Sequence, residues 1–190
     1  MLNLCLETLC NFIFPQFCEC CGKSSIEFLC RECFKACKLF NTEDKCFRCQ
    51  TPIDENDSIC LSCKKGFFYP KKVIVLFEEL IFDLNHLNKH KLKTLTALMT
   101  YAFYEQVSHP CFDSIQLAKK KQSSDQALLK GLAKSLSIPT EMTPFKKGEL
   151  LLFLPTYRST QELNIIYLKF LELGYEDISF LCLAKSPLVI

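Results

Sequence analysis

Residues 18–63 read CECCGKSSIEFLCRECFKACKLFNTEDKCFRCQTPIDENDSICLSC and contain four Cys-x-x-Cys pairs. Two thiolates separated by two residues can both turn towards one tetrahedral metal ion, because the backbone between them forms a tight knuckle. Four pairs supply eight thiolates, which is enough for two all-cysteine sites. We therefore expect two structural Zn2+ ions, held by Cys18, Cys21, Cys30, Cys33, Cys46, Cys49, Cys60 and Cys63.

The spacing between the pairs predicts which of them share an ion. Eight residues lie between the first and second pairs, 12 between the second and third, and 10 between the third and fourth. Pairing of neighbours closes two short loops, so we expect two consecutive zinc ribbons rather than an interleaved, RING-like arrangement. A site closed by four thiolates has no open coordination position, and it stabilises a fold rather than catalysing hydrolysis. The alternative, eight buried free thiols, requires four such pairs by coincidence.

Six further cysteines fall outside this pattern. A one-residue slip would let Cys20 replace a ligand, but packing or solvent exposure is the simpler expectation for Cys20 and Cys37. The others lie in apolar surroundings and are expected to pack as small hydrophobic side chains: Cys5, Cys10, Cys111 and Cys182.

Composition limits the class of protein. The chain has 190 residues with a net charge of only +2, so any nucleic-acid surface must be local. Residues 1–14 are apolar but lack the basic start and cleavage site of a signal peptide. No stretch reaches the roughly 18 to 20 apolar residues of a membrane span. We expect a cytoplasmic protein, in whose reducing surroundings thiols stay available to metals.

Cysteine density falls after Lys64, and the chain then alternates between strand and helix patterns. Strands are expected at 73–77, 113–118, 150–154 and 178–183, and helices at 80–87, 92–103, 123–136 and 159–173. This alternation predicts the α/β class, with a small, mainly parallel sheet. We place a double zinc-ribbon domain with an N-terminal apolar helix at 1–66 and the α/β domain at 70–190.

The order of these motifs resembles the ComF family of competence-associated proteins. The resemblance rests on LCNFIFP at 9–15 ahead of the cysteine pairs, on DQALL at 125–129 and on ISFLCLAK at 178–185. It implies a double zinc ribbon joined to a phosphoribosyltransferase-like domain. It also implies a role in DNA uptake, as a binding or scaffold protein for single-stranded DNA or for proteins of the competence machinery.

The family's phosphoribosyl pyrophosphate motif is a strand followed by two acidic residues and a Thr-Thr-Gly turn. The matching stretch here, residues 150–163, reads LLLFLPTYRSTQEL and places Leu154 and Pro155 at the acidic positions. Neither can bind ribose hydroxyls or Mg2+, so we expect no transferase activity. Arg158, Ser159 and Thr160 could still hold a phosphate at a helix N-terminus, unless Ser159 merely caps that helix. The segment between the preceding helix and this strand is also shorter than in the family.

Lysines suggest a local nucleic-acid surface. Residues 71–135 carry ten Lys against six Asp or Glu. A parallel sheet would bring a lysine triplet to its carboxyl edge, where Tyr157 could stack on bases. The candidate contacts are Lys89, Lys91, Lys93, Lys119, Lys120 and Lys121. The alternatives are a solvated charged face, a phosphoribosyltransferase with non-standard residues, and a zinc-ribbon interaction module in nucleic-acid handling.

Overall fold

The structure is a computed structural model. It describes residues 17–25, 29–54, 57–67, 69–78, 84, 87–108, 112–119, 123–140, 148–157 and 159–185. Several predictions lie outside these residues: the N-terminal apolar helix, most of the helix at 80–87, and the side chains of Lys120, Lys121 and Arg158.

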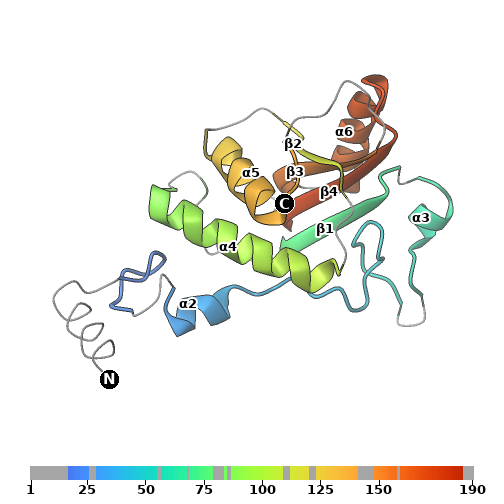
Figure 1. Cartoon of the computed structure of the whole chain (residues 1–190). Helices are drawn as coiled ribbons and strands as arrows, with labels where there is room; N and C mark the ends of the chain where they lie inside the picture. Colours follow the sequence, from blue (N-terminus) through green and yellow to red (C-terminus); the bar gives the residue numbers. More distant parts are fainter. Residues whose placement is uncertain are drawn as a thin grey trace.

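The described part of the chain forms one sheet of four parallel strands in the order β1-β4-β3-β2 (Figure 1). The strands are β1 Lys72–Phe77, β2 Ser114–Leu117, β3 Glu149–Tyr157 and β4 Asp177–Lys185. Strands β4 and β3 are central and pair along most of their length. The four strands predicted from the sequence, and the α/β class with a parallel sheet, are confirmed.

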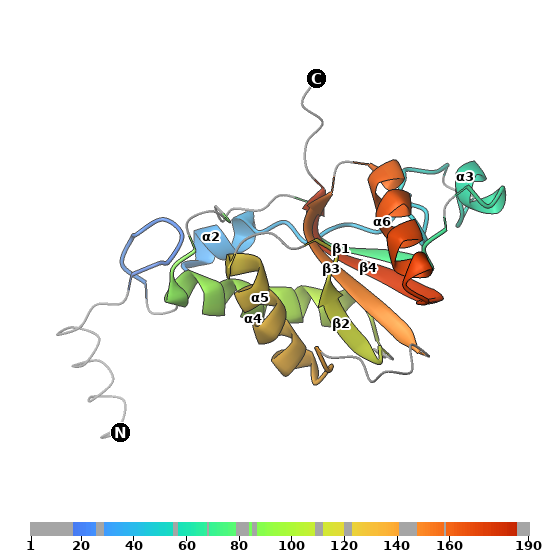
Figure 2. The ribbon, with the colours of Figure 1, turned by 90° about the horizontal axis from the view of Figure 1, so that it is seen from above.

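Helices cover both faces of this sheet. Helices α4 Lys89–Gln106 and α5 Ser123–Leu136 pack on one face and α6 Thr160–Glu172 on the other (Figures 1 and 2). None of the helices in the described residues has the length and apolar character needed to cross a bilayer.

Local sequence accounts for where the helices begin and how closely they pack. Asn88 caps α4 by accepting a hydrogen bond from the Lys91 amide, as its short polar side chain favours. Gly131 lets α5 approach α4 closely, since a Cβ there would lie 2.9 Å from Oγ1 of Thr96. Gly174 follows α6 with a φ of 88°, a conformation that glycine adopts without strain.

Alternation along the strands divides the apolar side chains between two cores. In β1, Ile74 and Leu76 face α4 and α5, whereas Val73 and Val75 face α6. A strand with helices on both faces must be apolar at every position, which explains the uninterrupted run from Val73 to Phe77.

One crossover of the sheet differs in hand from the other two. The connection from β1 to β2 runs across the sheet over the α4 face. The connection from β3 to β4 runs in the reverse direction over the α6 face. Because both the direction and the face are reversed, these two connections have the same hand. The connection from β2 to β3 also returns, but its helix α5 lies on the α4 face. Because about 98% of parallel crossovers are right-handed, β2–α5–β3 is the left-handed exception.

Two short helices lie in the N-terminal part of the chain, α2 Arg31–Ala36 and α3 Leu61–Lys64. Figure 2 shows α2 beside α4, and Cys63 of α3 belongs to the same buried cluster as Leu163 and Ile166 of α6. The cysteine-rich part of the chain therefore packs along the β1 side of the sheet and contacts both of its helical layers.

Candidate functional site

Eight cysteines come together in two groups of four. The first cysteine site consists of Cys18, Cys21, Cys30 and Cys33, and the second of Cys46, Cys49, Cys60 and Cys63. Within each group all four sulfur atoms lie within 4.8 Å of one another. The predicted pairing of neighbouring Cys-x-x-Cys motifs is confirmed, and each group could hold one metal ion.

The two sites repeat the same local structure. Each begins with a tight hairpin, in which the amide of Gly22 or Gln50 donates to the carbonyl of the first cysteine at 2.8 Å. Both residues have a positive φ, 72° for Gly22 and 58° for Gln50. The second pair of each site lies at the start of a short helix, with Cys30 preceding α2 and Cys60 preceding α3.

The sulfur geometry fits a tetrahedral ion. Four sulfurs at about 2.3 Å from a Zn2+ ion stand about 3.8 Å from one another. The Sγ atoms of Cys21 and Cys30 are 3.8 Å apart, and those of Cys49 and Cys60 are 3.5 Å apart. The two sites therefore have both the donor set and the spacing for such an ion.

One thiol in each site has a lowered pKa, which favours its thiolate form. Burial raises the pKa of Cys18, but the backbone amides of Cys21, Cys30 and Cys20 outweigh it and lower that pKa to about 6. In the second site, burial is likewise outweighed by backbone amides of Cys60, Cys49 and Arg48, and the pKa of Cys46 falls to about 7. Amides that point at sulfur stabilise the negative charge that a bound cation also requires.

Cys20 and Cys37 belong to neither group of four. Both are half-buried and pack against the core on the α4 face. Burial raises the pKa of Cys37 to about 11. This placement agrees with the expectation that these two thiols pack or lie exposed rather than serve as ligands.

The two sites lie on opposite faces of β1. In the first site, Cys18 shares the core on the α4 face with Ile74 and Leu76. Three cysteines of the second site share the core on the α6 face with Val73 and Val75. Hydrogen bonds also join the chain just after the second site to α6, because Asn164 donates to the Phe67 carbonyl at 2.8 Å and accepts from the Tyr69 amide at 3.2 Å.

The carboxyl end of β3, where a phosphoribosyl pyrophosphate motif would lie, is packed with apolar and aromatic side chains. Leu154 and Tyr157 are each only 2% exposed. Tyr157 therefore cannot stack on a base, and that prediction is wrong, because the side chain turns into the core on the α6 face. Burial raises the pKa of its phenol well above the usual value.

The start of α6 is occupied by groups of the protein itself. Ser159 caps the helix by accepting a hydrogen bond from the Glu162 amide at 3.3 Å. The carboxylate of Glu162 accepts from the ammonium of Lys119 at 2.5 Å. Ser159 therefore serves as the helix cap, and Lys119 is held on the α6 face of the sheet.

The other candidate lysines lie in the first turns of α4. Lys89 and Lys93 are exposed and Lys91 is half-buried. No acidic residue occurs in α4 before Glu105, and the positive end of the helix dipole adds to the lysine charges. This end of α4 is therefore locally basic.

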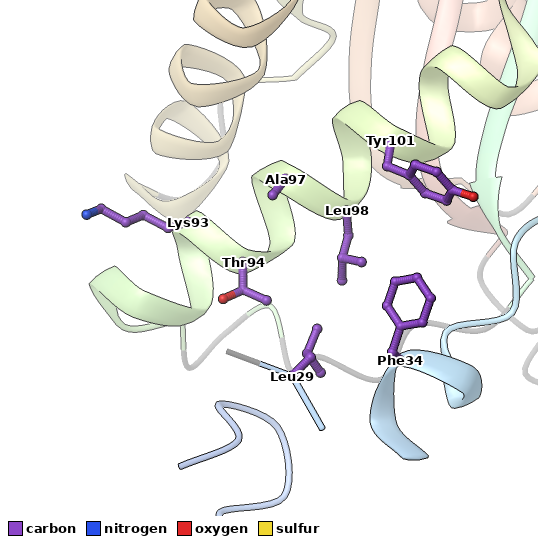
Figure 3. A pocket seen from close by; sticks show the side chains of 7 residues that line it. All are labelled: Leu29, Phe34, Lys93, Thr94, Ala97, Leu98 and Tyr101. Carbon is purple, nitrogen blue, oxygen red and sulfur yellow. The ribbon is translucent and has the colours of Figure 1, made fainter. Parts of the chain in front are cut away.

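Beside these lysines an apolar groove runs between α2 and α4 (Figure 3). This α2–α4 groove has a volume of about 590 Å3. The rings of Phe34 and Tyr101 stand at one end, about half exposed, and Lys93 at the other. Leu29 and Phe34 line it from the chain around the first cysteine site, and Lys93, Thr94, Ala97, Leu98 and Tyr101 from α4. Sequence reasoning missed Phe34 and Tyr101; the signal was the i, i+4, i+8 spacing of Lys93, Ala97 and Tyr101.

Comparisons with protein-family models, with curated proteins and with solved structures find no match to this chain.

Proposed function

We propose that this protein is a ComF-like binding protein in which two structural Zn2+ ions hold an N-terminal module against a degenerate phosphoribosyltransferase-like domain. It acts in DNA uptake, in a reducing cytoplasm, by binding single-stranded DNA rather than by transferring a phosphoribosyl group. The observation that carries the proposal is the packed carboxyl end of β3, which leaves the α2–α4 groove as the better binding surface.

Transfer from phosphoribosyl pyrophosphate requires carboxylates for the ribose and the metal ion. Leu154 and Pro155 supply none, and Leu154 is buried in the core. The missing ligands oppose this chemistry.

The left-handed crossover β2–α5–β3 supports descent from a longer domain. Right-handed crossovers are strongly preferred when a connection forms directly between parallel strands. When a longer connection loses the elements between its helix and the next strand, the helix can stay on the face of the sheet that makes the shortened crossover left-handed. This agrees with the short segment between α5 and β3 that the resemblance to ComF proteins indicates.

The α2–α4 groove has the character of a surface for single-stranded nucleic acid. Such surfaces combine cations that follow the phosphates with aromatic rings on which bases stack. Lys89, Lys91 and Lys93 supply the cations, and Phe34 and Tyr101 supply exposed rings. Because the charges are local, the proposal agrees with a net charge of only +2.

The test measures anisotropy of a fluorescent oligothymidylate of about 16 nucleotides, the upper site size of one small binding fold. We expect weak, salt-sensitive binding that Tyr101→Ala reduces at least about fivefold, as loss of one stacked base should. Lys64→Ala is the matched control, because Lys64 is exposed but belongs to α3 and pairs with Asp57. Equal affinity of all three proteins would contradict the groove as the binding site.

Calorimetry with phosphoribosyl pyrophosphate separates this function from an enzyme. We expect no binding with or without Mg2+. Magnesium-dependent binding would instead favour a transferase that uses non-standard residues.

A further inference from the structure

Strand β1 lies at the end of the sheet, and its outer edge is covered by residues 38–50, which run from the segment between the two cysteine sites into the second site. The amide of Phe40 donates to the Leu76 carbonyl, and the amide of Glu78 donates to the Lys38 carbonyl, both at 3.0 Å. At the other end, the Val73 amide donates to the Arg48 carbonyl at 2.8 Å. The side-chain amide of Gln50 donates to the Val73 carbonyl at 3.2 Å. Residues 38–50 thus supply hydrogen-bond partners for backbone groups at both ends of the outer edge of β1.

The strand beneath this cover would pair readily if it were exposed. Its residues 73–77 read VIVLF, and each is at most 1% exposed. An uncharged edge rich in β-branched residues is the kind that pairs with another chain unless something covers it.

The cover depends on the cysteine sites for its order. Among the described residues 17–67, the buried side chains are Cys18, Leu29, Cys46, Cys49, Gln50 and Cys63. Four of these six are thiols of the two sites, so little apolar packing remains without metal. The second site is the more direct support, because Arg48 lies between two of its ligands and Gln50 follows one.

We propose that the outer edge of β1 is a surface for self-association that stays covered as long as metal is bound. Loss of metal from the second cysteine site releases residues 38–50, and β1 then pairs antiparallel with β1 of a second copy of this chain. This inference does not depend on binding of nucleic acid.

Charge identifies the second copy as the occupant. A two-fold antiparallel pairing centred on Val75 sets Lys72 of each copy opposite Glu78 of the other. In the metal-bound form Glu78 contacts Lys45, which belongs to the cover, at 3.5 Å. Release of the cover removes that contact and leaves Glu78 to pair across the two-fold axis.

One group independent of metal also holds this edge. The side-chain amide of Gln106, the last residue of α4, donates to the Val75 carbonyl at 2.6 Å. This hydrogen bond must break when two β1 strands pair. Gln106→Ala should therefore shift association of the metal-free protein to lower concentrations.

The first test compares the zinc-loaded full chain with the chelated, reduced chain by sedimentation and by amide exchange. We expect a loaded monomer and a metal-free dimer. At concentrations below dimerisation, chelation should speed exchange of the Val73 and Glu78 amides about a hundredfold and leave Leu152 and Phe180 in the central strands protected. A metal-free monomer with a protected Val73 amide would overturn the proposal. So would an equal loss of protection in all four strands, because the metal would then support the whole domain.

Variants separate specific pairing from aggregation. Cys49→Ser in the second site should dimerise without chelator, whereas Cys21→Ser in the first site should retain the Val73 cover. Glu78→Lys should weaken the metal-free dimer about tenfold, because two attractive cross-strand pairs become repulsive. Adding Lys72→Glu should restore it. Failure of the charge reversal to restore dimerisation would overturn the two-fold arrangement.

Discussion

The ammonium nitrogen of Lys119 lies 2.5 Å from Oε1 of Glu162, and this ion pair joins the residues after β2 to the first turn of α6. The pair is partly shielded from solvent, and the carboxylate of Glu162 also interacts favourably with the positive end of the α6 helix dipole. At the edge of the sheet where phosphate-binding α/β proteins hold their ligands, these two charges therefore neutralise each other.

Lysines on opposite faces should consequently differ in their effect on nucleic-acid binding. Lys93→Ala should weaken binding of single-stranded DNA and lower the slope of log affinity against log salt by about 0.7, as loss of one phosphate contact does. Lys119→Ala should leave the slope unchanged, because Lys119 is engaged with Glu162. Titrations from about 50 to 200 mM salt measure both slopes. A larger change for Lys119 than for Lys93 would move the binding surface to the carboxyl edge of the sheet.

The buried phenol of Tyr157 predicts a limit to alkaline stability. Burial raises its pKa in the folded chain above the value of about 10 in an unfolded chain. The folded state then holds the proton more tightly, so the free energy of unfolding should fall as the pH rises past about 10. Denaturant melts at several pH values measure this fall, and Tyr157→Phe should reduce it. A phenolate absorbance from every tyrosine before unfolding begins would contradict the burial.

The close approach of α4 and α5 can be tested at Gly131. Alanine should gain about 1 kcal/mol of helix propensity there. Its Cβ would nevertheless meet Oγ1 of Thr96 at 2.9 Å and Cγ2 at 3.0 Å, and overpacking of this kind costs about 1 to 3 kcal/mol. Gly131→Ala should therefore lower the free energy of unfolding.

In a Thr96→Ala background both clashing atoms are absent, and the remaining Cβ contact of 3.5 Å is ordinary. Gly131→Ala should there be neutral or stabilising. A double-mutant cycle by urea unfolding gives the coupling, and simple additivity of the two changes would show that the helices are not in close contact here.

Ligand substitutions should distinguish the cysteines that hold metal from their neighbours. Cys30→Ser and Cys60→Ser should each lose one zinc ion per chain and unfold the module that contains the missing ligand, because metal binding supplies much of its folding free energy. Cys20→Ser is the matched control and should retain both ions. Zinc release measured with a chromogenic chelator checks the three variants; loss of an ion from Cys20→Ser would place that thiol among the ligands.

Much of the fold could be predicted from the sequence, because strand and helix signals are local. The run Val73–Phe77 and the capping serine at 159 both lie where the structure has the corresponding element boundaries, within one residue. The pairing of the cysteines followed from loop lengths. These features depend on residues that are close together in the chain.

The remaining features depend on contacts over long distances in the sequence. Tyr157 follows a buried strand and lies next to Arg158, so the sequence suggests exposure, but β3 extends to this residue and directs its ring into the core. The cover of β1 uses backbone groups of Phe40 and Arg48, which no side-chain pattern indicates. The groove needs Phe34 of α2 beside Tyr101 of α4, and only the folded chain brings them together.

The most direct test of the two metal centres combines metal analysis with zinc X-ray absorption on the full chain purified under reducing conditions. The structure predicts two zinc ions per chain, each surrounded by four sulfurs at about 2.3 Å. The folded protein with no zinc, or a zinc shell that contains nitrogen or oxygen in place of sulfur, would contradict the assignment of all eight thiolates to two closed structural sites.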